Sequence, residues 1–131
     1  MPYLKVGSGD LTAYPLLTKL SNLNKPIILS TGLANIDEVK DAINHICSVN
    51  PIYKEPDMLT ILQCTSMYPI PNEDANLSVI STFKKEFNYP VGYSDHTNST
   101  YAAEIAVALG ASMLELHFTD NKESTSFRDH L

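Results

Sequence analysis

The chain has 131 residues, 44% of them hydrophobic, so it is large enough for one core and is either one domain or part of a larger one. Its net charge is −6 and it has no basic stripe, which argues against nucleic-acid binding. No apolar run approaches the roughly 18 residues of a membrane span, and the first residues lack a signal-peptide layout. Two cysteines, Cys47 and Cys64, are too few for a disulfide framework and favour a cytoplasmic location.

Five short apolar runs with the length of strands follow one another along the chain. Each ends in small polar or imidazole side chains, a feature that packing alone does not require. In an α/β barrel, by contrast, the active site is built at the carboxyl ends of the parallel strands. The pattern therefore indicates an enzyme. The runs cover residues 5–10, 27–32, 61–66, 91–96 and 113–117.

Four segments between these runs have helical periodicity. The first begins near Ala13, and the second begins at Asn35, whose spacing to Glu38 is a capping-box pattern. The third ends before Pro90, and the fourth stops at Gly110, a residue type common just after a helix. The apolar residues that we expect the helices to bury are Leu16, Leu17, Leu20, Leu23, Ile36, Val39, Ile43, Ile46, Cys47, Leu77, Ile80, Phe83, Phe87, Ala102, Ile105, Ala106 and Leu109.

The alternation of strands and helices predicts a parallel sheet with right-handed crossovers. Five strands are too few to close an eight-stranded barrel, so we interpret the chain as the later part, about five strands, of a (β/α)8 TIM barrel. The alternative is a complete five-stranded doubly wound domain. Such folds usually carry a glycine-rich phosphate loop after the first strand, and this sequence has none there.

Two histidines, His96 and His117, end consecutive predicted strands. In a barrel this places them side by side at one mouth, within reach of a single divalent metal ion, for which imidazole is a suitable ligand. Asp129 and His130 near the C-terminus offer a carboxylate or a third ligand. The alternative is that each histidine is a structural residue held by hydrogen bonds.

Hydroxyl side chains form a rim at the ends of the other predicted strands. With nearby backbone N–H groups they suit a phosphate or a carboxylate, and Lys5 adds positive charge. The alternative is that these hydroxyls only cap the helices that follow. A second enzymatic hypothesis is a Schiff-base aldolase with Lys5 as nucleophile, which leaves both histidines without a role. The rim consists of Ser8, Ser30, Thr31, Thr65, Ser66 and Ser94.

Six motifs, in order and spacing, resemble the sialic acid synthases, which condense phosphoenolpyruvate with an N-acylated amino sugar to form a sialic, legionaminic or pseudaminic-type nonulosonic acid. The resemblance spans nearly the whole chain. The motifs are Lys-Val-Gly-Ser-Gly-Asp at 5–10, Lys-Pro-Ile-Ile-Leu-Ser-Thr-Gly at 25–32, Gln-Cys-Thr-Ser-Met-Tyr-Pro at 63–69, Val-Gly-Tyr-Ser-Asp-His-Thr at 91–97, Ala-Leu-Gly-Ala at 108–111 and Glu-Leu-His-Phe-Thr at 115–119.

The resemblance implies a role for each matching residue. His96 and His117 would bind Mn²⁺ or Mg²⁺, and Glu115 would handle a proton or the attacking water. Tyr68 would lie beside the sugar, and Asp129 would contact it. With His117, Glu115 and Asp129 are the implied catalytic residues. The residues expected to hold substrate are Lys5, Ser8, Ser30, Ser66, which replaces a common Asn, Tyr68 and Ser94.

The resemblance also implies parts that these residues do not include. The family's barrel has three earlier strands, and a small C-terminal domain resembling antifreeze proteins reaches into the partner's site in a homodimer. Residues 1–131 are thus expected to be a partial synthase barrel that is inactive alone. The non-enzymatic alternative is an inactive or interaction fragment of such a barrel.

Overall fold

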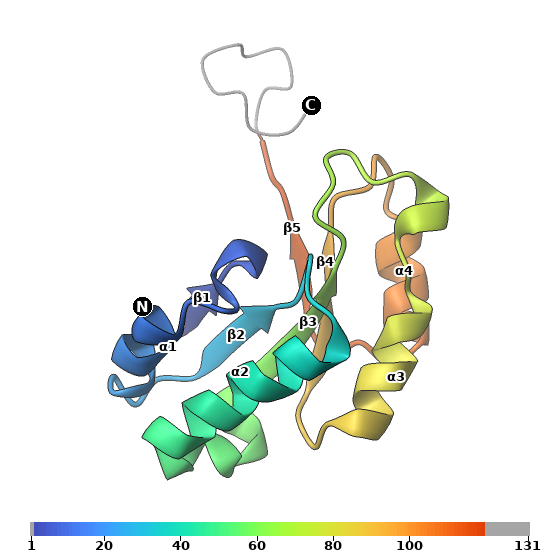
Figure 1. Ribbon diagram of the computed structural model, residues 1–131. Helices are drawn as coiled ribbons and strands as arrows, with labels where there is room; N and C mark the ends of the chain where they lie inside the picture. The colour runs from blue at the N-terminus through green and yellow to red at the C-terminus, as the bar shows by residue number, and fades with distance from the viewer. Residues whose placement is uncertain (1, 120–131) are drawn as a thin grey trace.

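The structure is a computed structural model of the chain and describes residues 2–119. Strands and helices alternate along it, as the sequence predicts (Figure 1). The strands are β1 (Leu4–Val6), β2 (Ile27–Ser30), β3 (Leu59–Cys64), β4 (Val91–Asp95) and β5 (Leu114–Leu116). The helices are α1 (Tyr14–Ser21), α2 (Ile36–Val49), α3 (Ser78–Glu86) and α4 (Tyr101–Ala108), with short 3-10 turns η1 (Ser8–Asp10), η2 (Pro51–Lys54), η3 (Pro56–Met58) and η4 (Asn72–Asp74).

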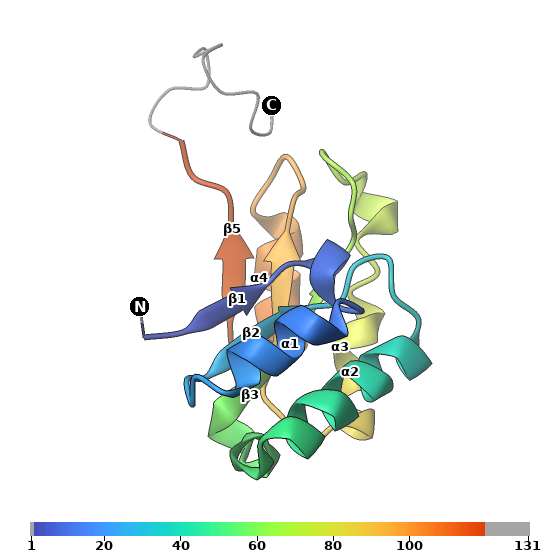
Figure 2. The same ribbon diagram turned by 60° about the vertical axis from the view of Figure 1, so that its left-hand side comes forward.

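The five strands form one sheet in the order β1-β2-β3-β4-β5, and each neighbouring pair is parallel. The strand direction turns steadily from β1 to β5, so the sheet curls (Figures 1 and 2). A doubly wound sheet reverses its strand order at a switch point, and this sheet does not. The structure therefore confirms the partial barrel and excludes the doubly wound alternative for the described residues.

The strand register separates an apolar face from a polar one. Val6, Leu29, Ile61 and Tyr93 lie on the face covered by the helices, and all four belong to the hydrophobic core. Side chains alternate between the faces of a strand. The intervening residues therefore point to the concave inner face, which corresponds to the barrel interior. On that face lie Lys5, Ser30, Cys64, Ser94 and Glu115.

The helices begin and end much as predicted, and the capping box of α2 is present. Asn35 Oδ1 accepts from the Glu38 backbone N–H at 3.0 Å, and Glu38 Oε2 accepts from the Asn35 N–H at 2.8 Å. Gly110 follows α4 with a φ of 91°, the left-handed conformation in which glycine carries no steric penalty. The described helices include none long and apolar enough to cross a membrane.

Four of the apolar residues expected in helix interfaces are exposed instead. Leu23 lies beyond the last turn of α1, and Leu16 lies on the outer side of that helix. In α4 the small side chains Ala102, Ala103 and Ala106 make the buried face, because small residues let the helix pack closely on β4. Ile105 and Leu109 therefore point away from the sheet, with exposed fractions of 51% and 36%.

Candidate active site

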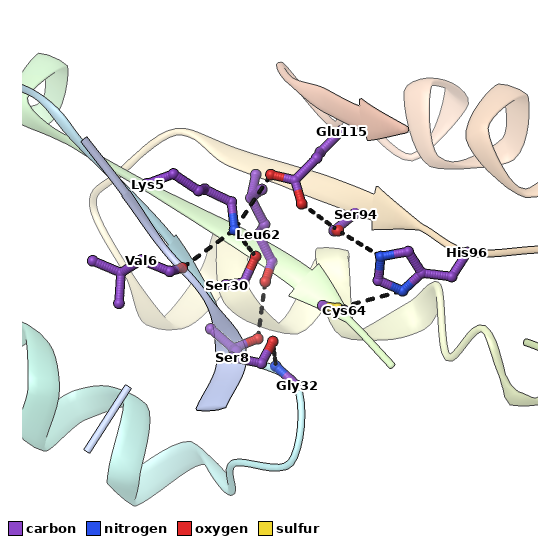
Figure 3. A network of polar contacts seen from close by, with 11 residues as sticks. Lys5, Val6, Ser8, Ser30, Gly32, Leu62, Cys64, Ser94, His96 and Glu115 are labelled. Atoms are coloured by element: carbon purple, nitrogen blue, oxygen red, sulfur yellow. Dashed lines mark hydrogen bonds and ion pairs between the residues drawn. The ribbon is translucent and has the colours of Figure 1, made fainter. Parts of the chain in front are cut away.

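A lysine and a glutamate from opposite ends of the sheet meet across the inner face. Lys5 Nζ on β1 lies 3.3 Å from Glu115 Oε2 on β5 and donates to Ser30 Oγ on β2 at 2.9 Å (Figure 3). Lys5 also donates to the Val6 carbonyl at 3.2 Å. The strands β1 and β5 are not neighbours, so this ion pair exists only because the sheet curls.

Ser94 connects Glu115 to His96. Ser94 Oγ donates to Glu115 Oε1 at 2.9 Å and lies 3.4 Å from His96 Nε2. Four strands thus contribute to one connected group, which we call the inner-face network. It consists of Lys5, Ser30, Ser94, His96 and Glu115.

The two nitrogens of the His96 ring have different neighbours. Nδ1 lies 3.3 Å from the Thr65 carbonyl oxygen, which can only accept, so Nδ1 carries the proton in this contact. Nε2 lies on the opposite side of the ring, 3.4 Å from Ser94 Oγ. A histidine that binds a metal typically donates its other ring N–H to a carbonyl or carboxylate in this way.

Three rings cluster beside the network. The Tyr68 ring centroid lies 4.1 Å from that of His96 and 5.9 Å from that of His117, and the two histidine centroids lie 5.2 Å apart. The loop that carries Tyr68 is fastened to β4, because the Ile70 N–H donates to the His96 carbonyl at 2.9 Å. The two histidines predicted to share a metal are therefore adjacent.

A second group of hydroxyls surrounds Gly32. The Gly32 N–H donates to Ser8 Oγ at 2.9 Å, and a Cβ atom added to Gly32 would collide with both Ser8 Oγ and Ser66 Oγ. Ser8 and Ser66 come from different loops, and glycine lets both hydroxyls approach the backbone here. Gly32 was not among the predicted site residues, although it follows two hydroxyl residues and ends the motif at 25–32.

Two hydroxyls of the predicted rim have structural roles instead. Thr31 Oγ1 donates to the Leu62 carbonyl at 2.9 Å, and Thr65 Oγ1 donates to the Asp74 carbonyl at 2.8 Å. Helix capping does not explain the rim either, because α1, α3 and α4 have no side-chain cap hydrogen bond. Thr31 and Thr65 thus use their hydroxyl protons within the fold. The sequence did not indicate that these two hydroxyls bind main-chain carbonyls.

The side chains fit a divalent metal in part. His96 and His117 supply two adjacent imidazoles, a donor type that suits Mn²⁺ and other transition metals. Within residues 2–119 no group of three or more His, Cys, Asp or Glu side chains could hold a metal ion. Asp129 and His130, the predicted additional ligands or sugar contacts, lie outside the described residues.

A groove of about 520 Å³ opens behind the polar ends of β2 and β3. It is lined partly by α2 and α3, through Val39, Val79 and Phe83, and partly by Thr65 and Ser66. The inner-face network does not line it. The candidate site is therefore the concave face of the sheet, and the groove lies on the helix side of its rim.

Comparison with known proteins places the chain in a family. Residues 1–131 match the NeuB family. An N,N'-diacetyllegionaminic acid synthase of Campylobacter jejuni is 43% identical over 126 residues, which cover 96% of this chain and 36% of that protein. The N-acetylneuraminate-9-phosphate synthase of Mus musculus is 41% identical, over 93% of this chain and 33% of the mouse protein.

Comparison with solved structures supports the same family. The crystal structure of the Bacillus subtilis spore coat polysaccharide biosynthesis protein spsE superposes with a TM-score of 0.86 at 35% identity, covering 98% of this chain and 35% of that one. The chain thus spans about a third of the length of the proteins it matches. On its sequence match and its fold, this chain belongs to the NeuB family of sialic and related nonulosonic acid synthases.

Proposed function

We propose that this chain forms the later part of the barrel of a metal-dependent synthase. The reaction joins phosphoenolpyruvate to an N-acylated amino sugar and releases phosphate, giving a nonulosonic acid. The proposal is supported by relatives named for legionaminic, N-acetylneuraminic and pseudaminic acid synthesis.

The single observation that carries the proposal is the inner-face network. Cation, hydroxyl, carboxylate and imidazole converge from β1, β2, β4 and β5 onto the one face that the helices leave uncovered. A structural network would not need all four chemistries on one face of the sheet. Phosphoenolpyruvate carries a phosphate and a carboxylate, which require a cation and N–H or O–H donors.

Each side chain has a role that its contacts suit. Lys5 and Ser30, with Ser8 and the Gly32 N–H nearby, would hold the anionic groups of phosphoenolpyruvate. A bond forms between C3 of phosphoenolpyruvate and the aldehyde carbon of the open-chain sugar. The C2=C3 π electrons of phosphoenolpyruvate form this bond, and the aldehyde oxygen takes up a proton to become a hydroxyl. Water then adds to C2, and Glu115, within 2.9 Å of the Ser94 hydroxyl, would accept the first proton that the water loses. The C2–O bond to phosphate then breaks, and the C2 hydroxyl becomes a ketone as its proton passes to the departing phosphate.

Metal chemistry belongs to the same proposal. His96 and His117 would hold Mn²⁺ or Mg²⁺, which when bound supplies Lewis-acid polarisation of the sugar's aldehyde oxygen. Tyr68 stacks against His96 and would border the sugar there.

The Schiff-base alternative is disfavoured by the surroundings of Lys5. Its ammonium has three polar neighbours, the Ser30 hydroxyl, the Val6 carbonyl and the Glu115 carboxylate. All three accept hydrogen bonds or charge from the ammonium, and the Glu115 carboxylate at 3.3 Å holds it in an ion pair, an arrangement that suits a charge partner better than a nucleophile. We therefore assign Lys5 to anion binding.

Location and assembly complete the proposal. Both cysteines are free, which suits a reducing compartment such as the cytoplasm. By family likeness the complete protein would be a homodimer in which a C-terminal domain completes the partner's site. The 131 residues alone would then lack part of the barrel and show little or no turnover.

The metal site is tested by calorimetric titration of Mn²⁺ into the protein expressed from its complete gene. His96→Ala and His117→Ala should each weaken binding at least ~10-fold, because each removes a metal ligand. His45→Ala is the matched control, since His45 contacts Thr18 and Tyr14 on the helix layer and should leave the affinity unchanged. Unchanged affinity in both single variants of the site would overturn the metal assignment.

A further inference from the structure

Asp95 is a buried carboxylate that the proposed chemistry does not use. It ends β4, directly before His96, and only 4% of its surface is exposed. Its neighbour Ser94 belongs to the inner-face network, so the alternation along the strand points Asp95 to the opposite face. Tyr93, which is fully buried in the core, shares that face. Asp95 therefore lies beneath the site and not in it.

One oxygen of Asp95 ties together the residues on both sides of His96. Oδ1 accepts from the Tyr93 hydroxyl at 3.3 Å and from the Thr97 N–H at 2.9 Å. The first donor sits three residues before His96, and the second sits one residue after it. The backbone that carries the imidazole is thus held from its buried side, at the point where the strand becomes a loop.

The other oxygen of Asp95 shows that this arrangement has a cost. Oδ2 is buried and has no hydrogen-bond partner among the described residues. An unpartnered buried polar atom is destabilising, so a position that served packing alone would be expected to carry an apolar side chain. The carboxylate is better explained by what Oδ1 holds in place.

We propose that Asp95 is a positioning residue for the metal-binding imidazole of His96. Its side chain is anchored in the core by the Tyr93 hydroxyl and holds the Thr97 N–H directly after His96, and the Ile70 N–H holds the His96 carbonyl. The ring is thereby held against Tyr68, with Nδ1 on the Thr65 carbonyl. Partners of this kind, which orient a ligand without touching the metal, typically contribute 10–100-fold to metal affinity or activity. The inference rests on the proposed function for its metal.

The test compares three variants of the protein expressed from its complete gene. Asp95→Asn keeps an oxygen that can accept both hydrogen bonds, Asp95→Leu keeps the size and removes the acceptor, and Tyr93→Phe removes one donor. We expect Mn²⁺ affinity to fall about 10-fold in the Leu variant, a few-fold in the Phe variant, and less than 3-fold in the Asn variant. Affinity for phosphoenolpyruvate should change by less than about 3-fold in all three, because Lys5 and Ser30 lie on other strands and Ser94 points to the opposite face of β4 from Asp95.

Several outcomes would overturn the proposal. It fails if folded Asp95→Leu binds Mn²⁺ like the wild type, or if the Asn variant loses as much affinity as the Leu variant. Equal losses of Mn²⁺ and phosphoenolpyruvate affinity would mean a general disturbance of the fold. If the Leu variant does not fold, the Phe and Asn variants provide the test, because wild-type Mn²⁺ affinity in Tyr93→Phe would refute the positioning role of Asp95.

A second measurement separates this proposal from the metal assignment. The nuclear Overhauser contact between the Tyr68 and His96 rings reports the position of the imidazole without any metal. The Leu variant should lose or weaken this contact and the Asn variant should keep it. If His96→Ala and His117→Ala both leave Mn²⁺ binding unchanged while the ring contact follows this pattern, the metal assignment fails and the positioning role of Asp95 stands. An unaltered ring contact in Asp95→Leu refutes the positioning role.

Discussion

Gly32 offers a sharp test of the hydroxyl group at the end of β2. A Cβ atom at this position would lie 2.8 Å from Ser8 Oγ and closer still to Ser66 Oγ, whereas ordinary contact begins at 3.4 Å. In Gly32→Ala the Ser8 hydroxyl must therefore retreat by at least about 0.6 Å, the difference between these two distances. A shift of about 1 Å in a positioning group can cost about 100-fold in rate.

The same substitution should have little effect on stability. The colliding atoms belong to serine side chains, which can rotate away. Losing the hydrogen bond from the Gly32 N–H to Ser8 costs about 1 kcal/mol, and replacing glycine by alanine at an unstrained position regains about 0.4–1 kcal/mol. The free energy of unfolding should thus change by no more than about 1 kcal/mol.

The assay is the KM for phosphoenolpyruvate, with thermal unfolding measured in parallel, in the protein expressed from its complete gene. Gly32→Ala should raise this KM about 10-fold or more. Gly9→Ala is the matched control, because a Cβ there meets no atom within 4 Å and the residue lies in the same part of the site. Equal KM values for the two variants would refute the reasoning, and so would a collapse of the fold in Gly32→Ala.

Three further predictions follow from other parts of the structure. Asn35→Ala removes the acceptor of the α2 capping box and should lower the free energy of unfolding by about 1 kcal/mol in denaturant titrations, while an unchanged midpoint would show that the cap is not stabilising. Burial raises the pKa of Tyr89 and of Tyr93 above the usual value of about 10, so their contribution to the free energy of unfolding should be constant below pH 10 and fall above it. Tyr89→Phe should make the fall above pH 10 less steep, and an equally steep fall would contradict this assignment. Borohydride added during turnover should trap no adduct on Lys5, and chelation should abolish activity; a trapped adduct on Lys5 would favour the aldolase hypothesis.

The fold was largely predictable because its signals are local. Apolar runs of strand length alternate with segments of helical period, and the capping box at Asn35 marks the start of α2. The exposure of Ile105 was not predictable in the same way. Its spacing matches the buried face of α4, but the three alanines set which side of the helix meets the sheet.

The sequence predicted which residue types make up the candidate site, but only some of the contacts between them. Strand-end positions placed His96 and His117 side by side, and the structure agrees. The ion pair of Lys5 with Glu115 depends on the curl of five strands, which no local pattern specifies. The hydrogen bond from the Thr97 N–H to Asp95 was likewise not predictable, because an aspartate at the end of a strand commonly begins a loop.

The central claim is that the inner-face network belongs to a phosphoenolpyruvate-dependent synthase. The most direct measurement is ³¹P NMR of phosphoenolpyruvate with Mn²⁺ and a panel of N-acylated amino sugars, with and without a terminal phosphate, using the protein expressed from its complete gene. The account predicts release of inorganic phosphate only when a suitable sugar is present, in equal amount to a nine-carbon keto acid identified by mass, and loss of both in Lys5→Met and Glu115→Gln. Phosphate release without a sugar, or the same product yield in both variants, would contradict it.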